Sequence, residues 1–380
     1  MNILMLTAYP PVLQMHGGGV RMYHNIRILA QQHGVRVISF VENERERELL
    51  RSLEGVCESI TAVQRIADFR PHWLSLDPFL VREFDTPAMH EAIEAAFCEK
   101  PVDVLQCEYL QMAQYKRRGV FSVLTIIETQ SDNAWAAFQK ESDPSLKLKL
   151  FYRWMQVLRY EVSSTRRFDR VVTMTEEDAV YLRSYSPDVD IRAIPIGINP
   201  EEFRPLAGDP THPLKVLFVG NFRHTPNVEA ARFLVTEIAP FFPQLRFVLS
   251  GANLPEDLKA TANVDCPGYV TDLRTLYERP NTIVMAPLFS GTGQRVKLLE
   301  AFSMACPIVA TSIAAYGYPV SSGREMLIAN SAADFRHALA QLVSSEELRT
   351  KLGMAGREMI LKRLDWLQIG PRLLEVVNPS

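Results

Sequence analysis

Short apolar runs alternate with segments of helical spacing along most of the chain. Asn2–Leu6 is an apolar run that predicts a buried strand, and Val35–Val41 predicts a second one. Between them, Met22, Ile26 and Leu29 recur at helical spacing. Strand, helix and strand in this order predict a parallel βαβ unit. Two further strands of this half are predicted at 102–107 and 122–127.

Helix signals in the first half are mostly local. Thr86 followed by Pro87 is an N-cap with proline at the first helical position, which predicts a helix start. Thr175 with Asp178 three positions later predicts a second capped helix. From Ala134 to Arg167 apolar residues keep helical spacing, which predicts a long helical segment.

The second half repeats the alternation. Strands are predicted at 215–220, 245–250 and 283–286, and helices at 332–342, 346–361 and 366–376. Pro200–Pro213 is rich in Pro, Gly and Asp, which is typical of a linker. Because 380 residues exceed what one hydrophobic core usually supports, two α/β domains are expected.

Composition narrows the class of protein. With 47% hydrophobic and 22% charged residues the chain is globular, and a net charge of -3 gives no global reason to expect a nucleic-acid partner. The five cysteines share no metal-ligand spacing and predict buried thiols in a reducing cytoplasm. The start of the chain lacks a signal-peptide pattern, and no run approaches the ~20 apolar residues of a membrane span. We expect a soluble cytoplasmic protein, with docking at the inner face of the membrane left open.

The segment 283–311 carries the clearest candidate chemistry. The small-residue loop Ser290–Gly293 lies between an apolar run and a helical pattern. Unpaired N–H groups at such a helix start, with Arg295 and Lys297 beside them, favour binding of a diphosphate. Glu300, about two turns beyond the loop, is placed to accept hydrogen bonds from ribose hydroxyls. The alternative is an ordinary strand–turn–helix unit whose glycines only permit a tight turn.

A second glycine-rich turn, Gly17–Gly19, follows the first predicted strand. Glu42 at the end of the second strand suggests an NAD site, as in a dinucleotide-dependent oxidoreductase. The fingerprint of that site needs G-x-G-x-x-G directly after the strand, whereas here about ten residues intervene and the glycines are consecutive. The dinucleotide hypothesis is therefore disfavoured.

The core of the segment, PLFSGTGQRVKLLEA at 287–301, closely resembles the donor-binding segment of retaining glycosyltransferases of family 4, the glycosyl transferases group 1. The resemblance implies the GT-B fold, in which two Rossmann-like domains face an interdomain cleft. It implies an acceptor-side domain over 1–196, a nucleotide-sugar-binding domain over 197–361 and a helix crossing back over 362–380. Two positions depart from the family: Thr292 replaces the first of two glutamates, and Ile127 replaces a histidine.

The resemblance also implies the reaction. A hexosyl group would move with retention from a UDP or GDP sugar to a hydroxyl of a carbohydrate, lipid-linked or protein acceptor. This would serve the synthesis of cell-surface polysaccharide, glycolipid or glycoconjugate, with the nucleotide sugar as co-substrate and neither cofactor nor metal. The donor-binding positions implied are Gly18, Gly19, Arg223, Tyr269, Val270, Gly291, Thr292, Gly293, Arg295, Lys297 and Glu300.

Glu128, Arg223 and Lys297 are expected to act in catalysis, and His16 and Glu108 to contact acceptor or sugar. For Glu128 the alternative is a local cap, and for His16 an exposed loop position without a role. The departures at Ile127 and Thr292 keep two other functions open: a non-catalytic nucleotide-sugar-binding protein and a GT-B nucleotide-sugar epimerase.

The basic residues of the long helical segment at 134–167 also have two explanations. A solvated helix face is the simpler one, and contact with an anionic membrane surface or a phosphorylated acceptor is the sharper one.

Overall fold

The computed structural model describes residues 1–13, 15, 17–65, 75–207, 212–258, 262–291 and 293–379. The chain divides into two compact units. Unit 1 comprises Met1–Pro195 together with Ile369–Ser380, and unit 2 comprises Ile196–Gln368.

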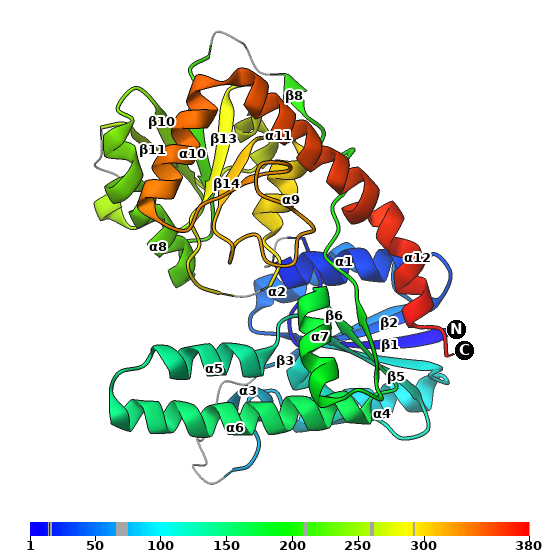
Figure 1. The fold of residues 1–380 in the computed structure, drawn as a ribbon. Coiled ribbons are helices and arrows are strands. Elements are labelled where there is room, and N and C mark those ends of the chain that lie inside the picture. The colour runs from blue at the N-terminus through cyan, green and yellow to red at the C-terminus, as the bar shows by residue number, and fades with distance from the viewer. Residues whose placement is uncertain are drawn as a thin grey trace. The chain divides into compact units, whose positions relative to one another are not determined.

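Unit 1 is built on a parallel sheet whose strands lie in the order β3-β2-β1-β4-β5-β6-β7 (Figure 1). Its strands are β1 (Asn2–Thr7), β2 (Gly34–Val41), β3 (Ser59–Gln64), β4 (Val104–Glu108), β5 (Phe121–Ile126), β6 (Arg170–Thr173) and β7 (Asp190–Ala193). Its helices are α1 (Gly17–Leu29), α2 (Glu44–Leu49), α3 (Phe79–Arg82), α4 (Pro87–Glu99), α5 (Gln130–Lys140), α6 (Pro144–Arg167) and α7 (Glu176–Tyr185), together with most of α12 (Trp366–Val376), whose first three residues belong to unit 2. Short 3₁₀ turns cover Leu50–Leu53 and Leu110–Tyr115.

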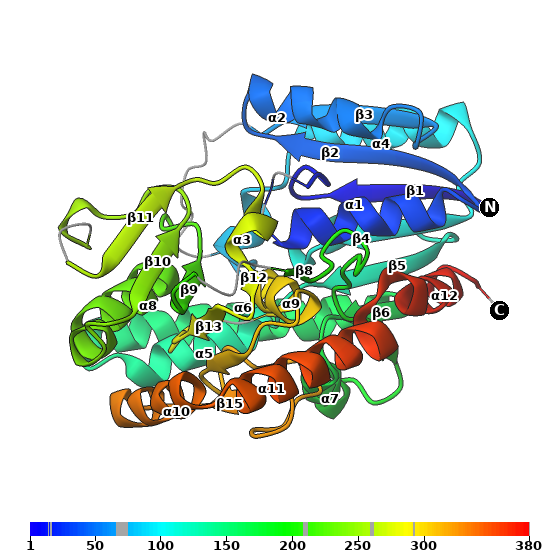
Figure 2. The same cartoon turned by 90° about the horizontal axis from the view of Figure 1, so that it is seen from above.

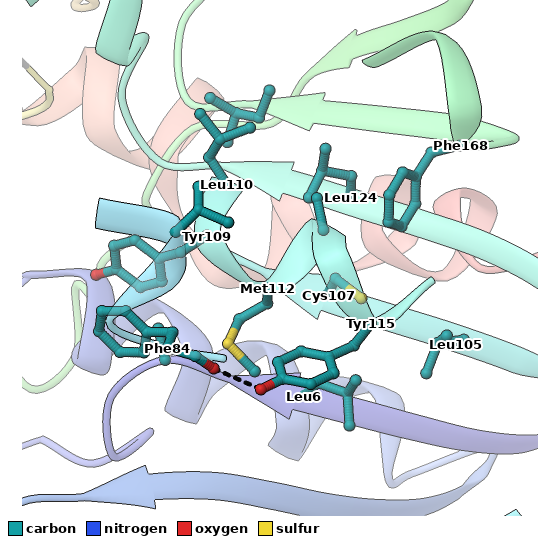
Figure 3. Close-up of a cluster of buried hydrophobic side chains, with 14 of the residues drawn as sticks. Leu6, Phe84, Leu105, Cys107, Tyr109, Leu110, Met112, Tyr115, Leu124 and Phe168 are labelled. Carbon is teal, nitrogen blue, oxygen red and sulfur yellow. Dashed lines mark hydrogen bonds between the residues drawn. The ribbon is translucent and has the colours of Figure 1, made fainter. Parts of the chain in front are cut away.

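The first strand lies in the middle of this sheet. Ile3 pairs with Val35 on one side and with Val104 on the other, both in parallel register, and β1 and β2 run side by side in Figure 2. A strand with neighbours on both edges and helices on both faces must be apolar throughout, which explains why Asn2–Leu6 does not alternate. The core on one face includes Leu6, Leu105 and Leu124, and Tyr115 donates a hydrogen bond to the Phe84 carbonyl within it (Figure 3).

The predicted helical segment from Ala134 to Arg167 is interrupted, and this corrects the sequence expectation. Residues 141–143 separate α5 from α6, which pack side by side (Figure 1). Asp143 caps α6 by accepting a hydrogen bond from the Leu146 N–H at 2.9 Å, and Pro144 occupies the first turn. The buried Glu161 of α6 caps the start of α5, accepting from the Gln130 N–H at 2.8 Å and the Ser131 N–H at 3.2 Å.

Unit 2 is a second parallel sheet, with the strand order β11-β10-β9-β13-β14-β15. Its strands are β9 (Lys215–Val219), β10 (Arg246–Ser250), β11 (Val264–Gly268), β13 (Thr282–Ala286), β14 (Ile308–Ala310) and β15 (Leu327–Ile328), and β8 (Leu206–Ala207) pairs with β12 (Glu278–Arg279) in a small separate sheet. Its helices are α8 (Thr225–Phe233), α9 (Val296–Ser303), α10 (Ala332–Ser344) and α11 (Glu346–Met359). π-helical turns at Leu234–Ile238 and Ile360–Leu364 extend α8 and α11.

The end of the chain packs on unit 1. Arg170 of β6 donates hydrogen bonds from Nη1 to the carbonyl oxygens of Glu375, Val376 and Asn378, at 2.8, 2.7 and 3.0 Å. The last carbonyl oxygens of a helix have no N–H partner within the helix, and here a single guanidinium nitrogen of Arg170 acts as their donor.

Candidate functional site

The strand order of unit 2 defines one place where a ligand is expected. β9 pairs with β10 on one side and with β13 on the other, so the order of connection reverses between β9 and β13. In open parallel sheets, ligands bind outside the carboxyl ends of the strands at such a switch point. α8 follows β9 and α9 follows β13, so both helices begin at this edge.

Both helices begin without a side-chain cap. The N-cap residues are His224 for α8 and Arg295 for α9, and neither side chain makes a capping hydrogen bond. Their first turns therefore present N–H groups and the positive ends of two helix dipoles at the same sheet edge. Such an arrangement favours an anion.

The glycine loop before α9 has a backbone that only glycine adopts readily. Gly291 has φ of 88° and Gly293 has φ of 78°. A Cβ atom on Gly291 would also lie 3.1 Å from Nη2 of Arg295, because the arginine side chain folds back over the loop. Thr292, predicted to bind the donor, lies outside the residues that the structure describes.

The loop is anchored from behind by Gln294 and Tyr318. Gln294 accepts a hydrogen bond from the Ile196 N–H at 2.7 Å and donates to the Gly317 carbonyl at 2.8 Å. Tyr318 donates from its hydroxyl to the Arg295 carbonyl at 2.7 Å. The start of α9 is therefore held in place before any ligand binds.

Lys297 joins the two helix starts. Its ammonium donates to Oδ1 of Asn227 on α8 at 2.7 Å and lies 4.3 Å from the ring centroid of Phe218. Asn227 is itself oriented by donating to the Asn221 carbonyl at 2.8 Å. Desolvation first, and then the nearby Arg295, lowers the pKa of Lys297 to about 7. A bound anion would restore the charge.

Glu300 lies one turn further along α9. Its Oε2 accepts a hydrogen bond from the hydroxyl of the fully buried Tyr277 at 3.1 Å. Desolvation raises the pKa of Glu300 to about 7, although Tyr277 and Lys297 act in the opposite direction. Burial therefore disfavours the charged form of both Lys297 and Glu300.

Three other predicted donor residues of unit 2 lie at the surface. Arg223 is exposed in the loop before α8, and its guanidinium makes no ion pair within the described part of the chain. Tyr269 has 74% of its surface exposed. Tyr269 and Val270 directly follow Gly268, the last residue of β11, whose φ is 75°. Among the described residues, no hydrogen bond or ion pair joins any of these three to Lys297, and their donor role stays a prediction.

Of the two predicted donor glycines of unit 1, Gly19 has an internal reason for its small size. Gly18 and Gly19 are buried in the first turn of α1 rather than in the preceding loop. A Cβ atom on Gly19 would lie 3.1 Å from the carbonyl oxygens of Pro10 and Val12. Their contact with a donor stays a prediction, and His16 lies outside the described residues.

The two predicted glutamates of unit 1 differ sharply in environment. Glu108 at the end of β4 is fully buried and holds Arg21 at 3.4 Å, while accepting from Gln106 at 2.6 Å and Thr125 at 3.1 Å. This enclosed network favours a structural role over the expected contact with acceptor or sugar. Glu128 after β5 is only partly buried and accepts from Nδ2 of Asn133 at 3.2 Å, so both of its hypotheses stay open.

Residues 213–345, which include both uncapped helix starts, match the family model of the glycosyl transferases group 1. This part of the chain is a glycosyl transferases group 1 domain. A curated relative, described as an uncharacterized 44.6 kDa protein in the cps region of Klebsiella pneumoniae, is 20% identical over 351 residues, which is 87% of each chain.

Solved structures resemble the whole chain in fold. Sucrose-phosphate synthase from Thermosynechococcus elongatus has a TM-score of 0.76 at 17% identity and covers 99% of this chain and 98% of its own. HepE from Anabaena in complex with UDP has a TM-score of 0.71 at 12% identity, with 99% of both chains covered. WaaG, a glycosyltransferase involved in lipopolysaccharide biosynthesis, has a TM-score of 0.67 at 14% identity and covers 99% and 100%. The expected α/β fold of the GT-B type is thereby confirmed.

Sequence reasoning missed two residues of the group 1 domain that hold the charged side chains. Asn227 positions Lys297, and Tyr277 positions Glu300. The sequence did carry a signal for Asn227, which lies close after the polar loop that follows Gly220. Gly220 packs against Asn227, because a Cβ atom on Gly220 would lie 3.0 Å from Cγ of Asn227. Tyr277 offered no local signal, because its partner is 23 positions away.

No group of three or more His, Cys, Asp or Glu side chains among the described residues could hold a metal ion. No helix in the described ranges is long and apolar enough to cross a membrane.

Proposed function

We propose that the protein is a retaining glycosyltransferase of family 4 that moves a hexosyl group from a nucleoside-diphosphate sugar to an acceptor hydroxyl. The observation that carries this proposal is the Lys297–Asn227 hydrogen bond between two uncapped helix starts, at the switch point of a group 1 domain. Two helix dipoles and a lysine that gains charge beside an anion suit a diphosphate.

The mechanism follows from where negative charge develops. The bond between the anomeric carbon and the phosphate oxygen breaks while the acceptor oxygen forms its bond on the same face, and the acceptor proton passes to the departing phosphate. Lys297, Arg295, Arg223 and the loop N–H groups stabilise the leaving diphosphate electrostatically. Neither a metal nor a cofactor has a role in this proposal.

Glu300 is proposed to bind the ribose. Tyr277 occupies its Oε2 by donating a hydrogen bond, which fixes the carboxylate and leaves Oε1 to accept from a ligand hydroxyl. The proposed base partners, Tyr269 and Val270, follow the positive-φ Gly268, where the backbone turns at the end of β11.

The donor and pathway are proposed from the relatives. HepE was solved with UDP and with UDP-glucose, WaaG is named for lipopolysaccharide biosynthesis, and the Klebsiella relative is encoded in a cps region. These support a UDP or GDP sugar as donor and a cell-surface polysaccharide, glycolipid or glycoconjugate as product, made in the cytoplasm.

The test is incubation with UDP-glucose, UDP-galactose, UDP-N-acetylglucosamine and GDP-mannose, with and without carbohydrate and lipid-linked acceptors. Nucleotide release that depends on an acceptor, with a product of the donor's anomeric configuration by NMR, is expected. A changed sugar on the released nucleotide would indicate the epimerase instead. Tight binding without turnover of any donor would indicate the non-catalytic binding protein.

A further inference from the structure

One face of α6 combines exposed apolar and basic side chains, and is here called the α6 face. Leu148, Tyr152 and Met155 have 70, 43 and 50% of their surfaces exposed and follow one another at helical spacing. Lys149 and Arg153 lie next to them in the sequence and are exposed as well. Large apolar side chains exposed together mark a contact surface more often than a solvated one.

The charge of α6 has a single sign at the surface. Its basic residues are Lys147, Lys149, Arg153, Arg159, Arg166 and Arg167. Its only acidic residue, Glu161, is fully buried under α5. Arg159 pairs with Asp77 at 3.2 Å, but Lys149 and Arg153 have neither a hydrogen bond nor an ion pair with any residue that the structure describes. Two cations of the α6 face are thus available to an anionic partner.

A groove extends the α6 face toward α3. It has a volume of about 780 Å³, and its apolar lining includes Phe79, Leu80, Leu148 and Tyr152. Its charged lining residues are Arg82, Lys149 and Arg153, with Glu83 as the one carboxylate among the lining residues that the structure describes. Phe79 on α3 has 52% of its surface exposed. The apolar surface therefore continues from one helix to the next and has room for hydrocarbon.

The α6 face is backed by rigid packing. Trp154 of α6 lies 4.7 Å from Trp135 of α5 between ring centroids, and Val157 is buried. The helix therefore cannot turn its exposed apolar side chains inward without breaking the aromatic cluster, and they stay on the outer surface of unit 1.

We infer that the α6 face docks the protein onto the surface of an anionic lipid bilayer. Apolar side chains would enter the region between headgroups and acyl chains, while Lys149 and Arg153 contact lipid phosphates, as in interfacial amphipathic helices. A second copy of this chain is a poorer occupant, because a symmetric contact would set these cations against themselves. The inference does not depend on the proposed function, since it needs no nucleotide.

The test is co-sedimentation of the full chain with vesicles of phosphatidylcholine alone or with 30% phosphatidylglycerol. Binding is expected only to the anionic vesicles and is expected to weaken with added salt, because salt screens exposed charges. The double variant Lys149→Glu/Arg153→Glu should lower the partition coefficient at least about tenfold. Leu148→Ser/Met155→Ser should lower it at low and high salt alike.

Matched controls come from exposed positions elsewhere on unit 1. Arg45→Glu/Arg118→Glu changes the net charge equally, and Val180→Ser removes an exposed apolar side chain of α7. Both should bind anionic vesicles like wild type, and the melting temperature should be unchanged in all variants. Equal binding to neutral vesicles, loss of binding in the charge control, or self-association that the Leu148→Ser/Met155→Ser variant abolishes would each overturn the inference.

Discussion

At the scale of single residues, the candidate donor site depends on how charge is held at two positions one turn apart on α9. Desolvation lowers the pKa of Lys297 to about 7 and raises the pKa of Glu300 to about 7. Each is oriented by one neutral partner, Asn227 or Tyr277, rather than by a counter-charge. The charge of this pair therefore responds to an incoming anion, which leads to three predictions.

Lys297→Ala should reduce kcat more than it reduces donor binding. Its charge matters most as negative charge develops on the leaving phosphate, and loss of one such donor typically costs about 100-fold or more. Steady-state kinetics with UDP affinity from calorimetry separate the two effects. Lys351→Ala, on the exposed face of α11, is the control. A higher KM at unchanged kcat would show that Lys297 only binds the ground state.

Diphosphate binding should take up a proton at pH 8. Free Lys297, with its pKa of about 7, is mostly neutral there, and a bound anion raises that pKa. Affinity should therefore fall as the pH rises above about 7. Calorimetry of UDP binding in two buffers with different heats of ionisation measures the uptake. Lys297→Met should abolish it, and the same uptake in that variant would refute the assignment.

Glu300→Gln should weaken UDP binding roughly tenfold, which corresponds to about 1.4 kcal/mol, because a charged acceptor of ribose hydrogen bonds becomes neutral. Inorganic pyrophosphate, which has no ribose, should bind the variant and the wild type alike. Comparing the two ligands by calorimetry decides the role. A parallel loss for both ligands would mean that Glu300 supports the phosphate site through Lys297 instead.

At the scale of elements, local signals predicted where helices start but not how they cap one another. The starts of α4 and α7 follow their N-cap residues: Thr86 accepts from the Met89 N–H at 3.3 Å, and Thr175 from the Asp178 N–H at 3.0 Å. The division between α5 and α6 was missed, although Asp143 followed by Pro144 is the same signal as at Thr86. The apolar residues keep helical spacing across residues 141–143, because both helices present apolar side chains to each other. This continuous spacing hid the capping signal at Asp143.

The cap that Glu161 provides for α5 gives an element-scale prediction. Glu161→Leu leaves the N–H groups of Gln130 and Ser131 without their acceptor and should cost about 3 kcal/mol of unfolding free energy. Burial raises the pKa of Glu161 to about 7, so the stability that its protonated form contributes is present at low pH and is lost as the pH rises through 7.

Glu161→Gln, which cannot ionise, should therefore lose less stability than wild type between pH 6 and 8. Urea denaturation at both pH values measures this. Glu177→Gln on the exposed surface of α7 should behave like wild type. Identical pH dependence in wild type and Glu161→Gln would show that the buried carboxyl does not titrate in this range.

At the scale of the whole molecule, the diphosphate residues and Glu128 belong to different units, which makes their roles separable. If Glu128 positions the sugar or the acceptor hydroxyl, Glu128→Gln should lower kcat about tenfold or more and leave UDP affinity near wild type. If it only caps a local turn, the variant should lose stability and keep its activity per folded molecule. Melting and kinetics on one preparation distinguish these, and full activity in a stable variant removes Glu128 from the reaction.

The sequence by itself determined the alternation of strands and helices, the two α/β units and the glycine loop before α9, because these depend on spacing and on residues adjacent in the chain. The tertiary structure decided which polar groups meet. Lys297 finds Asn227 from 70 positions away, and Glu108 is enclosed by Arg21 from 87 positions away. Both contacts arise because parallel strands bring distant segments to one sheet edge, so no local pattern distinguishes the buried Glu108 from the accessible Glu128. The pKa values that prepare α9 for an anion have the same origin, since desolvation is a property of the packed fold.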